Sequence, residues 1–242
     1  MKKRALIVCG GWPGHEPFLV GERCKKMLEE ENFEVELADA LDAYADKEKL
    51  MGLNLIVPMW TQGTLLDDYQ FNIADAVESG VGLAGCHGGM CDSFRWNTEY
   101  QFMTGAQWVS HPGVKWYHNV SVLDPEVMKR HPVPEGAFDI EYTVNICRNS
   151  SSPIVEGIPD FKVTSEQYYL HVDPAVHVLA TTTVKDSEGP HATNGPVVMP
   201  VVYTKLWGKG KIFYSSLGHV DKIFEIPEVS EIMRRGMIWA AK

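Results

Sequence analysis

Three histidines each follow a predicted β-strand at a glycine-containing turn. His15 lies in the loop Gly10-Gly-Trp-Pro-Gly-His-Glu16, His87 in the turn Gly85-Cys-His-Gly-Gly89, and His219 at the end of Ser215-Ser-Leu-Gly-His219. Because residues that follow parallel strands meet at the carboxyl edge of a sheet, we expect these imidazoles to form one site. Imidazoles titrate near neutrality, so they can act as general acids and bases, and they are also common zinc ligands.

The turn around His87 has the form of a nucleophile elbow. In an elbow, small flanking residues permit a strained strand-to-helix turn that projects the central side chain into a cleft over the sheet. The alternative is an ordinary glycine-rich turn in which His87 only caps the following helix. For His15, the alternative interpretation is a solvent-exposed loop residue. Gly10-Gly11 is followed by neither GxGxxG nor a P-loop lysine, so we expect no nucleotide cofactor.

Metal binding is the second chemistry open to these histidines. His15, His87 and His219 are candidate ligands for a divalent metal such as zinc, and His111, Glu166 and His171 are further donors. Their spacing matches no compact motif such as HExxH, so the metal prediction depends on convergence in the fold.

Aromatic and polar residues near the same strand ends indicate a carbohydrate ligand, because flat rings stack on sugar rings while polar side chains bind hydroxyls. If the segment 165–169 is extended, Glu166 and Tyr168 share one face. Alternatively, Glu166 is an exposed edge-strand residue beside a packing tyrosine. The tryptophans near these loops are Trp12, Trp60, Trp96 and Trp108. The candidate substrate-binding residues are His15, Trp60, Gln62, His111, Tyr168 and Asp221, with Asp92 as a further polar contact.

Apolar β-branched segments alternate with helical patterns through the first half of the chain. Strands are predicted at 4–9, 34–38, 53–58 and 81–85, and helices from Pro17 and over 65–78. This alternation predicts an α/β fold with a doubly wound, mostly parallel sheet. Further strands at 116–123, 138–146, 176–184, 198–205 and 211–216 predict an antiparallel extension, with a hairpin loop at 205–210. The last helix begins at about Pro227.

The length, charge and cysteine content of the chain exclude several classes of protein. The 242 residues carry a formal charge of −10 and fit one domain spanning 1–242. The acidic balance argues against a nucleic-acid partner, and no apolar run long enough for a membrane helix or a signal peptide is present, so we expect a cytoplasmic protein. The five cysteines form no CxxC pair, which favours a reducing compartment. An exposed edge strand in the second half favours a homodimer or a larger homo-oligomer.

Four motifs resemble the trehalose-utilisation, or ThuA-like, family. They are Gly85-Cys-His-Gly-Gly89, Ser110-His-Pro-Gly113, Ser165-Glu-Gln-Tyr168 and Gly208-Lys-Gly-Lys-Ile-Phe-Tyr-Ser-Ser-Leu-Gly-His219. The resemblance extends from the first strand to the last helix and implies a flavodoxin-like, class I glutamine amidotransferase-like fold. In amidotransferases the elbow carries a cysteine, whereas His87 takes that position here and Cys86 is one residue early. The resemblance therefore implies no glutaminase activity, and His219-Val-Asp221 is similar to the amidotransferase His-x-Glu with a shorter acid.

The leading hypothesis is an enzyme of sugar catabolism that acts on a disaccharide-derived or keto sugar. His87 and His219 would exchange protons, Glu166 would orient one of them or bind hydroxyls, and a metal would polarise a carbonyl. One alternative is a non-catalytic binding or regulatory protein on an amidotransferase fold that lost its nucleophile. In that case the site would be apolar and metal-free, with His87 buried. Another alternative is a metal-dependent hydrolase unrelated to sugars.

Overall fold

The computed structural model describes residues 2–111, 129–130, 138–185 and 190–242. Within these residues the main sheet has nine strands, in the order β2-β1-β3-β4-β11-β10-β9-β6-β7. These are β1 (Lys3–Gly11), β2 (Phe33–Ala38), β3 (Leu55–Thr61), β4 (Gly82–Cys86), β6 (Asp139–Ile146), β7 (Phe161–Glu166), β9 (His177–Val184), β10 (Val197–Trp207) and β11 (Gly210–Ser215).

The sheet has a parallel part and an antiparallel part. Strands β2, β1, β3, β4 and β11 run parallel, in an order equivalent to the flavodoxin-like 2-1-3-4-5. Strand β11 then pairs antiparallel with β10, and the remaining strands continue antiparallel. This arrangement confirms the predicted doubly wound sheet with an antiparallel extension. A separate antiparallel pair joins β5 (Ala106–Ser110) to β8 (Tyr169–Val172).

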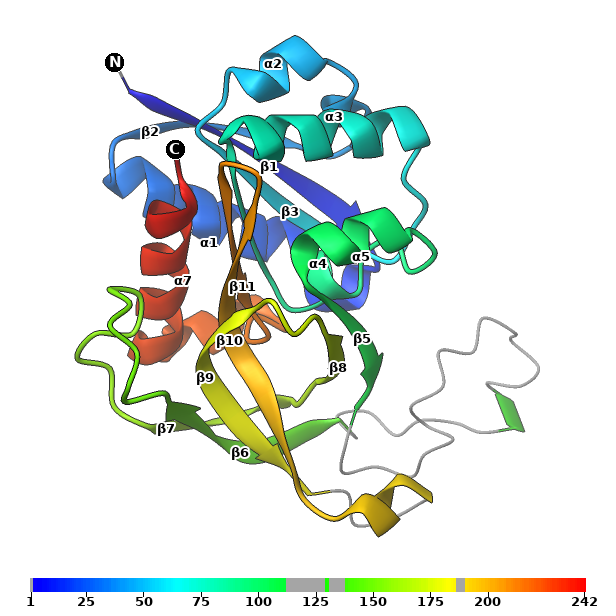
Figure 1. Ribbon diagram of the computed structural model, residues 1–242, viewed down its shortest axis with the longest axis vertical. Helices are drawn as coiled ribbons and strands as arrows, with labels where there is room; N and C mark the ends of the chain where they lie inside the picture. The colour runs from blue at the N-terminus through cyan, green and yellow to red at the C-terminus, as the bar shows by residue number, and fades with distance from the viewer. Residues whose placement is uncertain (1, 112–128, 131–137, 186–189) are drawn as a thin grey trace.

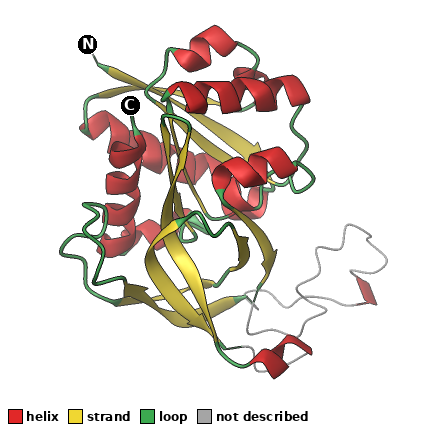
Figure 2. Cartoon of the chain, viewed as in Figure 1, coloured by secondary structure: helices red, strands yellow, loops and turns green. Residues whose placement is uncertain are grey.

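Helices cover both faces of the parallel part (Figures 1 and 2). Side chains of β1 alternate between two cores, with Ile7 in one and Leu6 in the other, as expected for a strand buried on both faces. The first core lies under α1 (Pro17–Glu30) and α7 (Pro227–Ala240). The second lies under α2 (Lys47–Met51), α3 (Asp67–Ser79) and α5 (Thr98–Thr104).

The two longest helices follow their sequence patterns. Helix α1 begins at Pro17 and buries Val20, Cys24, Met27 and Leu28, which is the predicted stripe. Helix α7 begins at Pro227, as predicted. None of the helices in the described ranges is both long and apolar enough to cross a bilayer.

Several predictions of local structure were incomplete. Strand β10 continues to Trp207, so the predicted loop at 205–210 shrinks to a tight turn in which Gly208 has φ of 57°. The short elements α2, β5, β7 and β8 were not predicted. The predicted strand at 116–123 lies outside the described residues.

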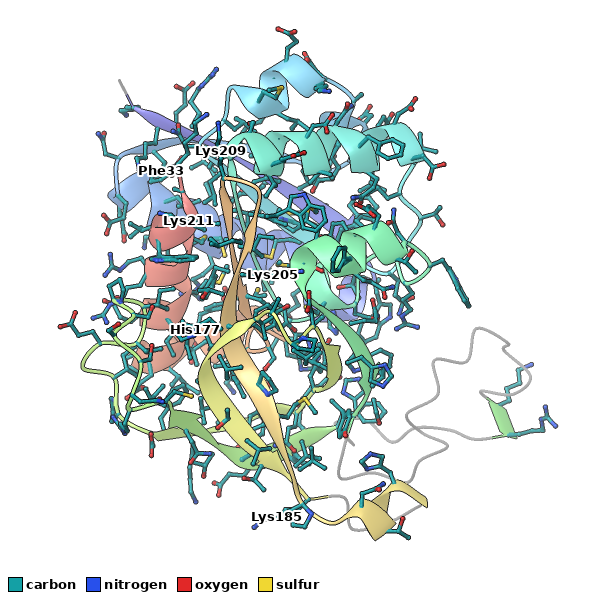
Figure 3. All side chains as sticks on the ribbon, viewed as in Figure 1. Phe33, His177, Lys185, Lys205, Lys209 and Lys211 are labelled. Atoms are coloured by element: carbon teal, nitrogen blue, oxygen red, sulfur yellow. The ribbon has the colours of Figure 1, made fainter. Side chains whose placement is uncertain are left out.

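Lys205 on β10 is buried where the antiparallel part meets α5 (labelled in Figure 3). Its Nζ atom lies 2.6 Å from Oδ2 of Asp173 and 4.6 Å from the ring centre of Phe102. The carboxylate compensates the buried charge, as a buried lysine requires. This contact ties β10 to the turn after β8.

Candidate functional site

Three histidines and one glutamate converge at the carboxyl edge of the parallel strands. We call His15, His87, Glu166 and His219 the histidine–glutamate cluster; one ligand atom from each lies within 4.8 Å of all the others. Nε2 of His87 lies 3.0 Å from Oε2 of Glu166, and Nε2 of His15 lies 3.6 Å from the same oxygen. Nε2 of His219 lies 3.6 Å from Oε1 of Glu166. The structure therefore brings together the three histidines that the strand positions predict.

The cluster is assembled from both parts of the sheet. His15 ends a short 3-10 helix after β1, His87 directly follows β4, and His219 follows β11. Glu166 is the last residue of β7, at the far end of the antiparallel part. The Nε2 atoms all approach Glu166, so this carboxylate is the centre of the cluster.

The turn at His87 is strained in the way an elbow requires. His87 has φ of 48° and ψ of −136°, a conformation that L residues rarely adopt. The neighbouring glycines are needed because a Cβ on Gly88 would lie 2.5 Å from the His15 ring, and one on Gly89 would lie 2.9 Å from Cα of Met59. The His87 side chain makes no capping hydrogen bond to α4 (Gly88–Cys91).

The expectation that His87 projects into an open cleft is wrong. Its side chain is 1% exposed and stacks on the ring of Tyr168, with centroids 3.9 Å apart. The antiparallel part of the sheet supplies Glu166 and the following Tyr168, and these residues cover the elbow. Sequence patterns around the elbow contain no information about that cover.

The Nδ1 atom of each cluster histidine, which we call its outer nitrogen, contacts a polar group other than Glu166. Nδ1 of His87 lies 2.8 Å from the carbonyl oxygen of Ser216, and Nδ1 of His15 lies 2.8 Å from Oγ1 of Thr61. Nδ1 of His219 lies 3.5 Å from Oδ1 of Asp139. Such outer partners fix the orientation of a metal-binding or catalytic imidazole.

The pKa shifts of His87 and Glu166 indicate where the protons lie at their contact. Burial lowers the pKa of His87 to about 3, so the ring is neutral at pH 7. The Ser216 carbonyl can only accept a hydrogen bond, so the proton is on Nδ1 and a lone pair on Nε2 faces Glu166. Burial alone raises the pKa of Glu166, but the surrounding histidines outweigh it and hold that pKa below its usual range. At 3.0 Å this lone pair and the carboxylate oxygen repel each other unless a proton or a cation lies between them.

His111 extends the site on the side of Tyr168. Its Nε2 atom lies 3.8 Å from Oε2 of Glu166, and its ring centre is 5.3 Å from that of Tyr168 and 5.0 Å from that of Trp108. Burial lowers the pKa of His111 to about 4, so it is neutral at pH 7. Trp12 contacts the cluster at His15, with ring centres 4.7 Å apart.

Asp221 lies elsewhere than its similarity to an amidotransferase acid suggests. Its carboxylate accepts two hydrogen bonds from Arg23, at 2.7 and 2.6 Å. The carboxylates within 4 Å of His219 in the described chain belong to Glu166 and Asp139. Asp221 therefore tethers the loop after β11 to α1 and does not orient His219, while its role as a substrate ligand stays a prediction.

The structure shows other contacts for several further predicted residues. The Trp60 ring packs against Gly10 and Gly63, and the backbone of Gln62 bonds to Asp92 and Phe94. His171 is an exposed residue of β8. Burial raises the pKa of the Cys86 thiol to about 12, a poor state for a nucleophile.

Thr61, Ser216 and Asp139 were missed by sequence reasoning. Thr61 ends β3 and Ser216 follows β11, so the carboxyl-edge rule that selected the histidines applies to them as well. Asp139 begins β6 and has no such signal.

Comparison with known proteins gives one family match over nearly the whole chain. Residues 4–240 match the ThuA family model, described as trehalose utilisation. A search of curated proteins finds no match.

Solved structures share the fold. A ThuA-like protein from Parabacteroides merdae ATCC 43184 has 19% identity over 99% of this chain and 90% of that chain, with a TM-score of 0.69. A cytoplasmic protein from Salmonella typhimurium LT2 has 12% identity over 99% of this chain and 100% of that chain, with a TM-score of 0.62. A β-galactosidase from Bacillus circulans sp. alkalophilus has 9% identity over 99% of this chain and 30% of that chain, with a TM-score of 0.55.

Proposed function

Because this chain belongs to the ThuA family of trehalose-utilisation proteins, we propose that it is an enzyme acting on a disaccharide-derived or keto sugar, with a divalent metal such as zinc held at the histidine–glutamate cluster. The family supports the coarser statement, a protein of the trehalose-utilisation type. The metal and the reaction are inferred from the geometry of the cluster.

The contact between His87 and Glu166 carries the proposal. A neutral imidazole presents a lone pair to a carboxylate at 3.0 Å, which is unfavourable unless a cation or a shared proton lies between them. Three imidazole nitrogens and one carboxylate form a donor set that suits zinc. The hydrogen bonds that hold the outer nitrogens also fit a metal site, because they orient each Nε2 atom inward.

The chain's own residues suit a sugar substrate. A bound divalent metal would polarise a carbonyl or hydroxyl oxygen. His111 is neutral and lies beside Glu166, so its imidazole can form a hydrogen bond with a sugar hydroxyl. Trp12 is 44% exposed beside His15 and offers an aromatic face to the apolar side of a sugar ring.

The first experiment is elemental analysis of protein purified without a metal-affinity tag. We expect about one equivalent of a divalent metal per chain, which Glu166→Gln and His87→Ala each abolish. His171→Ala is the matched control, because His171 is exposed on β8, and it should retain the metal. Turnover of keto sugars by metal-free protein would overturn the metal proposal and favour exchange of protons between His87 and His219.

The burial of His87 favours one second candidate, a non-catalytic sugar-binding or regulatory protein. A residue that is 1% exposed reaches substrate only if the cover containing Tyr168 moves. Saturable binding of a sugar without turnover, in protein that holds its metal, would select this candidate over the enzyme.

A further inference from the structure

A pocket lies beside the first turns of α3. It has a volume of about 380 Å³ and is lined by the loops at 63–65 and 94–99 and the first turns of α3. The cluster residues do not line it. Backbone pairing joins the two loops beside it, because the amide of Gln62 donates to the carbonyl of Asp92 and the amide of Phe94 donates to that of Gln62. The volume lies within the range of about 300–1,000 Å³ that is usual for small-molecule sites.

Gln70 lines the pocket and carries an unsatisfied, buried side-chain amide. The residue is 2% exposed, and both Oε1 and Nε2 are buried without a hydrogen-bond partner in the structure. Leaving such atoms unpaired costs about 1–3 kcal/mol, whereas an apolar side chain would fill the space without that cost. An amide both donates and accepts, so a ligand with neighbouring hydroxyl groups satisfies both atoms.

Aromatic and acidic side chains complete the pocket. Phe71 and Trp96 line it while 59% and 94% exposed, so their rings are available to a ligand. The carboxylates of Asp67 and Glu99 are also among the lining residues and disfavour an anion such as phosphate. Aromatic faces beside amide and carboxylate oxygens suit the apolar face and the hydroxyl rim of a neutral sugar.

We propose that this pocket binds one neutral pyranose unit, with Trp96 and Phe71 against its C–H faces and the Gln70 amide bonded to neighbouring hydroxyls. The site is for recognition and is separate from the chemistry of the histidine–glutamate cluster. This proposal rests on the proposed function only for the choice of a sugar as the class of ligand.

The test is calorimetric titration with methyl α-D-glucopyranoside, methyl β-D-galactopyranoside and methyl α-D-mannopyranoside. We expect saturable binding of at least one, weakened about tenfold or more by Trp96→Ala and by Gln70→Leu. Phe102→Ala is the matched control, because Phe102 is an exposed aromatic residue on the neighbouring helix that does not line the pocket. Wild-type protein treated with a chelator should also retain binding, so failure of the metal proposal leaves this result intact.

Thermal unfolding of the Gln70→Leu variant separates a ligand-binding role of the Gln70 amide from a structural role. If the amide serves a ligand, Gln70→Leu should unfold at the same temperature as wild type or higher, while losing the sugar. A lower Tm with unchanged binding would show that the amide is structural and would overturn the proposal. Absence of binding of all three glycosides at millimolar concentration would also overturn the proposal. A change in oligomeric mass in the Trp96→Ala variant would overturn it as well, because it would identify the pocket as a protein interface.

Discussion

Nε2 of His87 lies 3.0 Å from Oε2 of Glu166, although the two residues are 79 positions apart and belong to different parts of the sheet. The histidine follows a parallel strand and the glutamate ends an antiparallel one. Their meeting makes the site a product of the joined sheet, because neither part alone contains both groups. The predictions below test how the surrounding residues maintain this contact.

At the proposed metal site, Thr61 should control affinity without contacting the metal. Its hydroxyl lies 2.8 Å from Nδ1 of His15, and loss of such an outer partner typically weakens metal binding by about 10–100-fold. We expect this loss for Thr61→Val, which keeps the shape, and near wild-type affinity for Thr61→Ser. Competition with a chromophoric chelator would measure both. Equal affinity in the valine variant and wild type would contradict the role.

The strain at His87 predicts an unusual order of stability. The positive φ costs about 1–3 kcal/mol for any side chain with a Cβ, and glycine removes most of that cost while adding about 0.5–1 kcal/mol of unfolded-state entropy. His87→Gly should therefore unfold at a higher temperature than His87→Ala, although both lose the imidazole. Differential scanning calorimetry would show the order, and the reverse order would exclude a strained elbow.

Leu83 is the structural control for the elbow. It lies in β4, four residues before His87, and is fully buried. Leu83→Ala should lower stability by about 2–5 kcal/mol through the cavity that it opens, while metal content in the folded protein stays unchanged. Denaturant unfolding and elemental analysis on the same sample would separate the two effects.

Gly88→Ala should displace His15. The added Cβ would lie 2.5 Å from the His15 ring, so the imidazole must move away from Glu166. We expect weaker metal binding in this variant. In a His15→Ala background, the same change should have little further effect, because the obstructing ring is gone. Additive losses in the double-mutant cycle would show that Gly88 acts through some other contact.

The pair between Asp221 and Arg23 should give a pH-dependent contribution to stability. Hydrogen bonds from Arg23 lower the pKa of Asp221 below its usual value of about 3.9. The pair therefore stabilises the fold above that usual pKa, and the contribution is lost as the pH falls through the lower folded value. The effect is at most about 1 kcal/mol, because both side chains are partly exposed.

The corresponding measurement compares the Tm of wild type and Asp221→Asn over a range of pH. The difference should have its full value well above the usual aspartate pKa of about 3.9 and disappear only when the pH falls below the lowered pKa of the folded state. If Asp221 serves only as this tether, sugar binding or turnover should be unchanged at pH 7. Loss of sugar binding in the folded variant would support Asp221 as a substrate ligand.

Sequence reasoning succeeded where periodicity was strong. The parallel strands and α1 were predicted because their apolar positions repeat regularly, and the carboxyl-edge rule then placed His15, His87 and His219 together. The short strands β5, β7 and β8 were missed because, unlike the equally short β2 and β4, they lie outside the regular alternation of apolar strands and helices in the first half of the chain.

The residues that surround the histidine–glutamate cluster were harder to predict from the sequence than the residues that form it. Burial of His87 under Tyr168 depends on how the antiparallel part folds over the elbow, and no local pattern encodes that contact. Asp221 was misplaced because similarity to a His-x-Glu motif does not reveal that Arg23 on α1 competes for the carboxylate. Side-chain partners across a fold are set by strand register, which the sequence alone leaves undetermined.

The pairing of β4 with β11 has a consequence for folding kinetics. It aligns Leu83 with Ile212 and Cys86 with Ser215, and the elbow is then fixed by a hydrogen bond from the His87 amide to the Ser215 carbonyl. Such distant contacts raise the contact order, and closing the intervening chain slows the search for the native topology. A nascent chain therefore lacks the complete cluster until its last strand has been synthesised, and metal capture would report the final step of folding.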